Sequence, residues 1–198
     1  MTVAAVTGRH RVLDLTDHLD STGFTRPDAT DAGALNIWGN TFATGDLPAG
    51  HPHWLVDGVP FRTAEAGGPD HLRCRGQYLE VPIGRYDWLH LLATAERRTE
   101  DPVLLHFSDG AVDPEWLRVS DLWPGGQAHF GEVPALRGSR LHYPRHVQAD
   151  MRPTLWAQRV AVSRRASLVG LRLPENPALH VFAVTLERPP ESPEASCA

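Results

Sequence analysis

The sequence predicts a single all-β domain, a two-sheet antiparallel β-sandwich of the jelly-roll type, and two observations carry that prediction. The chain has 198 residues, and its 17 prolines and 17 glycines interrupt most windows that are long enough for a helix. Short apolar runs bounded by turn residues recur instead, which is the pattern of an all-β fold. About ten such runs are enough for two packed sheets.

The turn residues and the apolar runs together define the individual strands. Asp57 and Gly58 separate two short runs and favour a tight type I′ hairpin, because both positions accept a positive φ. Residues 86–93 and 102–107 are the most apolar runs and should be central in their sheets. The expected strands cover residues 11–15, 34–42, 53–56, 59–62, 71–73, 77–81, 86–93, 102–107, 116–122, 154–162, 167–173 and 179–186.

The domain boundary follows from composition at the C-terminal end. Residues 1–186 are expected to form one β-sandwich domain, since a chain of this length can bury a full core. Residues 187–198 hold three prolines and three glutamates and few side chains that could pack. We expect this segment to be a disordered tail.

Charge and hydropathy argue against several classes of partner. The net charge is −5 with histidine neutral, whereas nucleic acids and anionic membranes select a basic face. The chain has no run of about 18 apolar residues, so no membrane span is expected. The first eleven residues lack the apolar core of a signal peptide. We therefore expect a cytoplasmic protein without a nucleic-acid or membrane partner; the oligomeric state stays open.

A series of short motifs recurs in order over most of residues 11–186. The motifs are Gly58-Val59-Pro60-Phe61, Arg75-Gly76-Gln77, Leu89-His90-Leu91-Leu92-Ala93-Thr94-Ala95, Phe107-Ser108-Asp109-Gly110, Ser120-Asp121-Leu122-Trp123 and Leu173-Pro174-Glu175-Asn176-Pro177-Ala178-Leu179-His180-Val181-Phe182-Ala183. In this order the chain resembles galactose-binding-like jelly-roll domains, similar to the carbohydrate-binding domains attached to actinobacterial glycoside hydrolases. The resemblance implies a jelly roll and, as a ligand, a saccharide. It also implies structural roles for His90 and His180.

The densest group of polar and aromatic residues is expected in a proline-marked loop between strands. This group contains His142, Tyr143, Arg145 and His146. Loops on a rigid sandwich are where binding residues gather, and arginine can clamp a carboxylate or phosphate. His142 or His146 would act as acid or base if the protein is catalytic. The alternative is a solvated loop.

Exposed tryptophans are the expected contacts for a sugar ring, which stacks its apolar C–H face on the indole. Trp38 and Trp123 lie beside glycine and proline, so we expect both to be exposed, whereas Trp88 should belong to the core. The predicted ligand-binding residues are Trp38, Asn40, His51, His53, Trp123, Tyr143 and Arg145.

Two groups of residues suggest metal ions without establishing a metal site. His51 and His53 are two apart and would share one face of a strand, so both imidazoles could bind one metal; the alternative is a polar loop. Five aspartates crowd the N-terminal region and suggest a structural calcium ion; the alternative is solvated loop acids. These aspartates are Asp14, Asp17, Asp20, Asp28 and Asp31.

Two functions remain open at this stage. The first is a free-standing jelly roll that binds a sugar or a glycosylated small molecule. The alternative is a small enzyme of secondary metabolism, a histidine-based cyclase, isomerase or hydrolase that uses the same cleft. Should the loop cluster prove to be uninvolved, the strand histidines His90 and His106 become the better candidates, since we expect them to face the concave sheet.

Overall fold

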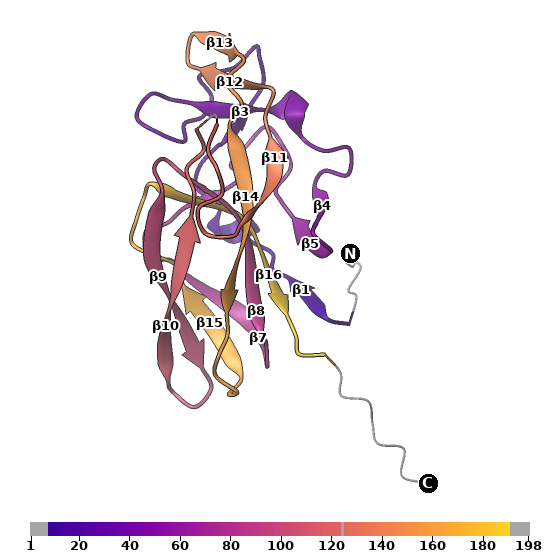
Figure 1. Ribbon diagram of the computed structural model, residues 1–198, viewed down its shortest axis with the longest axis vertical. Coiled ribbons are helices and arrows are strands. Elements are labelled where there is room, and N and C mark those ends of the chain that lie inside the picture. The colour runs from indigo at the N-terminus through magenta and orange to yellow at the C-terminus, as the bar shows by residue number, and fades with distance from the viewer. Residues whose placement is uncertain (1–7, 124, 191–198) are drawn as a thin grey trace.

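Two antiparallel sheets face each other in the computed structural model, which describes residues 8–123 and 125–190 (Figure 1). The larger sheet has the order β1 (His10–Val12), β16 (Leu179–Glu187), β8 (Trp88–Ala95), β14 (Thr154–Ala161) and β11 (Val133–Arg137), and β6 (Leu72–Arg73) also pairs with β16. The second sheet has the order β10 (Val112–Val119), β9 (Thr99–Phe107), β15 (Leu168–Arg172) and β7 (Tyr78–Gly84).

The strand order is that of a jelly roll. The larger sheet contains β1-β16-β8-β14 and the second contains β7-β15-β9-β10, so successive strands of this set cross between the sheets, except for the β9–β10 pair within the second sheet. These pairings are antiparallel throughout. The predicted fold class, an all-β sandwich, is therefore confirmed.

The main core lies between the two sheets and follows from alternation along the strands. Leu89 and Leu91 of β8 share one buried cluster with Val103 and Leu105 of β9. The opposite face of the larger sheet is also covered near one end, where Leu92 and Phe182 belong to a second cluster. Burial on both faces explains why β16 reads as a nearly continuous apolar run with every residue buried.

Two smaller units build that second layer. One is a four-stranded sheet with the order β13 (His146–Ala149), β12 (Arg140–Tyr143), β3 (Thr41–Ala43) and β2 (Phe24–Thr25), at the upper end of the molecule in Figure 1. The other is the hairpin of β4 (His53–Val56) and β5 (Val59–Arg62). Its turn residues Asp57 and Gly58 have φ values of 49° and 77°, as the type I′ prediction requires. Two short 3₁₀ helices cover Thr16–His18 and Thr44–Asp46.

The segment 34–42 is mostly a loop, not the strand that we predicted. The side-chain oxygen of Asn36 accepts hydrogen bonds from the backbone N–H groups of Trp38 and Asn40. Gly39 has a φ of 68°, which belongs to the left-handed region. This local asparagine turn competes with strand pairing, and only Thr41–Ala43 joins a sheet.

Two further boundaries differ from the prediction. His142 and His146 lie on β12 and β13, a hairpin, where we expected a loop; β13 is exposed along its whole length, so it lacks the alternation that reveals a strand. Glu187, the first residue of the predicted tail, ends β16, and the N–H of Arg188 donates to the carbonyl of Arg9. Residues 191–198 of that tail lie outside the described residues. No helix in the described part of the chain could span a membrane.

Candidate functional site

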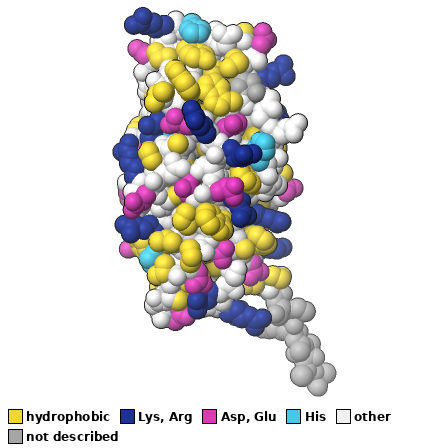
Figure 2. Space-filling view, turned by 60° about the vertical axis from the view of Figure 1, so that its left-hand side comes forward, with side chains coloured by type: hydrophobic (Ala, Val, Ile, Leu, Met, Phe, Trp, Pro, Cys, Tyr) yellow, Lys and Arg dark blue, Asp and Glu magenta, His cyan; other side chains and the backbone are white. Residues whose placement is uncertain are grey.

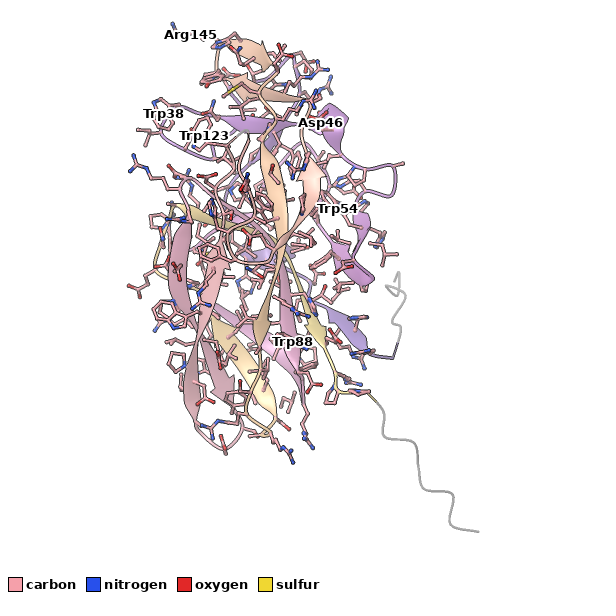
Figure 3. All side chains as sticks on the ribbon, viewed as in Figure 1. Trp38, Asp46, Trp54, Trp88, Trp123 and Arg145 are labelled. Carbon is pink, nitrogen blue, oxygen red and sulfur yellow. The ribbon has the colours of Figure 1, made fainter. Side chains whose placement is uncertain are left out.

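Two tryptophans from separate loops meet at the upper end of the molecule. Trp38 precedes β3 and Trp123 follows β10, and their ring centroids are 5.7 Å apart in an edge-to-face arrangement. Trp38 is 52% exposed, beside the fully exposed side chain of Ile37. Hydrophobic side chains gather at this end in Figure 2, and Figure 3 shows the two labelled indoles side by side. We call this pair the tryptophan platform.

Hydrogen bonds hold the backbone of Trp38 and the indole of Trp123 in place. The N–H of Trp38 donates to the Asn36 side chain, and the indole N–H of Trp123 donates to the carbonyl of Glu96 at 3.2 Å. Gly39 lets the Trp38 loop approach the β12–β13 hairpin, because a Cβ there would lie 2.6 Å from Pro144 Cγ. The Asn36 turn and the close approach at Gly39 therefore determine the exposed position of Trp38 and its contact with Trp123.

Asn40 lies beneath the platform and does not reach the surface. Its side chain is fully buried, donates to the carbonyl of His142 at 3.2 Å and accepts a hydrogen bond from the Asn36 amide. The predicted role of Asn40 as a ligand contact is therefore replaced by a supporting role: it ties the Trp38 loop to β12.

His142 is also buried, which removes it from the surface where we expected an acid or base. Its Nδ1 lies 2.9 Å from the hydroxyl of Thr25, which is 2.5 Å from that of Thr41, while Nε2 has no hydrogen-bond partner among the described residues. Burial lowers the pKa of His142, the charge of Arg140 lowers it further, and Asp46 opposes the shift. A neutral, enclosed imidazole bridges β2, β3 and β12 here and stabilises the small sheet.

The other members of the predicted cluster occupy the tip of the β12–β13 hairpin. The rings of Tyr143 and His146 stack 4.6 Å apart with an interplanar angle of 8°. Arg145 is exposed in the turn, and Figure 3 shows it at the extreme end of the molecule, beyond the platform. These three residues flank Pro144, and Pro144 is the residue that contacts Gly39 of the Trp38 loop.

His51 and His53 are on another part of the surface. Figure 3 separates Trp54, the neighbour of His53 on β4, from Trp38 and Trp123 by the width of the molecule. The Nδ1 atom of His51 lies 3.2 Å from the Thr63 hydroxyl, beside a pocket of about 300 Å³, whereas His53 is exposed. The structure thus does not unite these two histidines with the remainder of the predicted site.

No group of three or more histidine, cysteine, aspartate or glutamate side chains is placed for a metal ion within residues 8–123 and 125–190. Three of the five aspartates that suggested calcium have local hydrogen bonds instead. Asp14 accepts from Thr16, Asp20 from Ser21 and Arg73, and Asp28 from Arg26. The expected calcium site is not formed by these residues.

A second concave region lies under the β4–β5 hairpin, on the outer face of the larger sheet. We call it the histidine groove; its volume is about 260 Å³. His90 of β8 is bound there to Glu187 of β16, with 2.7 Å between Nε2 and Oε2. The lining residues are Val56, Asp57, Val59, Phe61, His90, Gly131, Val133, Ala157, Gln158, Arg159 and Glu187.

Charged and aromatic side chains surround the His90–Glu187 pair. Arg9 forms an ion pair with Glu187, the ring of His10 lies edge-on to His90 at 6.3 Å, and Arg159 lies 4.3 Å over the ring of Trp88. Burial lowers the pKa of His90, and the hydrogen bond that it makes to Glu187 opposes that shift. Burial raises the pKa of Glu187, but the hydrogen bond with His90 and the neighbouring positive charge of Arg9 act against burial, and the pKa is lowered.

Sequence reasoning missed this groove because it placed Glu187 in the tail and named His90 only as a second choice, together with His106. Strand periodicity contained the signal. His90 alternates with Leu89 and Leu91, which face the core, so its side chain points to the outer face. Thr185 pairs with His90, and the alternation of β16 carries Glu187 to that same face.

The remaining strand histidines have different surroundings. His180 is fully buried with its Nδ1 3.1 Å from His71, whose own Nδ1 lies 2.8 Å from Asp70. Burial, followed by His71 and Arg73, lowers the pKa of His180 to about 2. His106 alternates with core residues of β9 and lies against Tyr78 on the solvent side of the second sheet. His90 and His106 therefore do not share a concave face.

Comparison with known proteins identifies the family of this fold. Residues 9–190 match the family model of the AziU2-like beta-sandwich domain, which extends over nearly all of the described chain. No curated protein matches the sequence. The match begins just before β1 and ends just after β16, so it contains both sheets, the tryptophan platform and the histidine groove. The chain belongs to the AziU2-like β-sandwich domain family.

Proposed function

We propose that the protein binds a sugar or a glycosylated small molecule at the tryptophan platform. The observation that carries the proposal is the meeting of two indoles at an exposed corner, 5.7 Å apart: a hydrogen bond to the Glu96 carbonyl holds the indole of Trp123, and the Asn36 side chain holds the backbone of Trp38. A half-exposed indole offers the apolar face on which the C–H side of a sugar ring stacks. Fixing the ring in advance reduces the entropy that binding must overcome.

Polar groups next to the platform supply partners for the hydroxyls of a sugar. A shallow hollow of about 440 Å³ extends from Asn36 and Ile37 to Asp31, Arg73 and Arg75. Arg73 donates to the carbonyl of Ala34 and lies 3.9 Å from Glu96, the residue whose carbonyl holds Trp123. A partly exposed aromatic side chain with a few convergent polar groups is the usual composition of a small-molecule site.

Calorimetric titration with a panel of monosaccharides and aryl glycosides tests this function. Replacement Trp38→Ala should weaken binding about tenfold or more, because a stacking surface is lost. Trp116→Ala is the matched control: Trp116 is 56% exposed on β10, makes no ring contact with the platform and does not line the hollow. Absence of saccharide binding at millimolar ligand, or equal losses in both variants, would contradict the proposal.

The alternative of a histidine-based enzyme does not gain support at the platform. His142 is enclosed and His146 is stacked on Tyr143 at the hairpin tip, so neither histidine faces the hollow beside Trp38. A reaction at this end of the molecule would need other groups. Binding is therefore the function that we assign to this region.

A further inference from the structure

The histidine groove has a built floor and a fixed roof. The floor consists of strands β8, β14 and β16, which contribute His90, Arg159 and Glu187. The β4–β5 hairpin forms the roof and is fastened to the floor by the hydroxyl of Thr185, which donates to the carbonyl of Pro60 at 2.7 Å. The walls are therefore positioned by regular structure, which holds reactive groups more accurately than a loop does.

The hydrogen bond to Glu187 indicates the protonation state and the tautomer of His90. Glu187 is ionised, because its pKa is held below the usual value, and an ionised carboxylate can only accept. The 2.7 Å contact therefore assigns the proton to Nε2 of His90, which donates to Glu187. The lowered pKa of His90 keeps the ring neutral, so its Nδ1 carries a lone pair. A neutral imidazole oriented by a carboxylate is the arrangement of a general base.

Four further groups shape the charge around this pair. Arg9 precedes β1 and His10 begins it, Arg159 comes from β14, and Asp57 from the β4–β5 turn. Arg159 is the cation among the lining residues, and it lies on the same strand face as His90, its partner in register. A negative charge that develops on a molecule in the groove would therefore be met by a guanidinium group.

We propose that the histidine groove is a second functional site, in which His90 accepts a proton from a small organic molecule with an acidic C–H or O–H bond. The proton moves to the imidazole, and the electron pair of the broken bond stays on the ligand as an anion beside Arg159. Glu187 acts as a positioning residue. With about 260 Å³, the groove takes a molecule of one or two rings, smaller than most drug-sized ligands.

A proton-abstraction probe tests the site without knowledge of its natural ligand. In 5-nitrobenzisoxazole, a base removes the C3 proton, the C–H electron pair completes the nitrile and the N–O bond breaks to give a coloured phenolate. We expect saturable release of this phenolate by the folded protein. His90→Gln keeps a donor toward Glu187 but cannot accept the proton, so the rate should fall at least about tenfold.

The pH profile separates a base from a merely structural histidine. The rate should rise with pH and reach half its plateau below about 6.5, the ordinary histidine value. Glu187→Gln removes the negative charge that raises the pKa of His90 and leaves only a neutral amide oxygen to accept its hydrogen bond. This variant should therefore show a lower plateau and a profile moved to still lower pH, which a loss of packing alone would not produce.

His129→Ala is the control, because this histidine is exposed and lies outside the groove. It should retain the full rate. Thermal unfolding of each variant verifies that the protein remains folded, and the histidine ¹⁵N spectrum of the unaltered protein reports the tautomer of His90. The proposal is overturned if folded His90→Gln keeps the rate, if the protein is no faster than an equal concentration of imidazole, or if His90 is protonated at neutral pH.

Discussion

The tryptophan platform and the histidine groove are built in opposite ways. The platform consists of side chains from two loops. A hydrogen bond to a backbone carbonyl fixes the indole of Trp123, the Asn36 side chain holds the backbone of Trp38, and the half-exposed Trp38 indole projects into solvent. The groove consists of side chains from neighbouring strands, and its reacting pair is largely enclosed. Trp38 and Trp88, which mark the two regions, lie at opposite halves of the molecule in Figure 3. The comparison shows that one sandwich can hold an exposed aromatic surface on its loops and an enclosed pair of charged or polar side chains on its strands.

The largest effect should come from Phe182, which is 1% exposed on β16 and packs against Phe24 and His71. Phe182→Ala should lower the free energy of unfolding by about 3–5 kcal/mol, because a large buried ring is removed. Since β16 supports both regions, saccharide binding and probe turnover should decline together. Denaturant unfolding measures the change. A loss below about 1 kcal/mol would show that the two halves of the molecule are supported independently.

Asn40→Ala should separate the two regions. The substitution leaves the carbonyl of His142 and the amide of Asn36 without their partner, at a cost of about 1–3 kcal/mol. The Trp38 loop should become mobile, so saccharide binding should be lost while probe turnover in the groove persists. Calorimetry and the phenolate assay on the same preparation measure both. Equal losses at the two regions would contradict their separation.

Low pH should decrease the free energy of unfolding, because the buried histidines must take up protons. The pKa values of His90, His142 and His180 are lowered in the folded state, so the unfolded chain binds more protons below about pH 6.5. A depressed pKa contributes stability that is complete above the unfolded value and is lost as the pH falls. Urea unfolding at pH 7, 6 and 5 should show a decreasing free energy of unfolding, and His142→Gln should reduce the slope. A flat profile would refute this.

The smallest effect is expected at Arg145, which is exposed at the tip of the β12–β13 hairpin. Arg145→Ala should change the free energy of unfolding by no more than about 0.5 kcal/mol, as is usual for surface positions. Saccharide affinity should fall by about twofold, since Arg145 lies beyond the platform. Should calorimetry instead find a loss as large as that of Trp38→Ala, the binding site would include the hairpin tip.

The sequence predicted the sandwich well because alternation and turn chemistry are local signals. Asp57-Gly58 placed the β4–β5 hairpin with both strands at their observed bounds. The hairpin of β12 and β13 escaped prediction, because β13 is exposed on both faces and its residues carry no apolar pattern. The loop at 36–40 escaped for a different reason: the Asn36 side chain takes the hydrogen bonds that a strand would have used.

The candidate site was predicted only in part, because burial and strand pairing are tertiary properties. Trp38 is exposed, as its glycine neighbour predicted, whereas Trp123 is partly buried, because its indole packs against Trp38 and the second core cluster. His142 and Asn40 were taken as surface groups, yet the small sheet encloses both. The approach of His90 to Glu187 spans 97 positions in the chain, so only the register of β8 against β16 could reveal it.

The position of β16 has a consequence for how the protein is made. This last strand lies between β1, the first strand, and β8, so the larger sheet stays open until the ribosome has released residue 187. Before that moment the edges of β1 and β8 that pair with β16 have no hydrogen-bonding partner. Non-local strand pairing of this kind is slow, and the unpaired edges are prone to aggregation. Within the sandwich Glu187 is therefore among the last side chains to arrive, and a nascent chain cannot assemble the histidine groove ahead of the complete sheet.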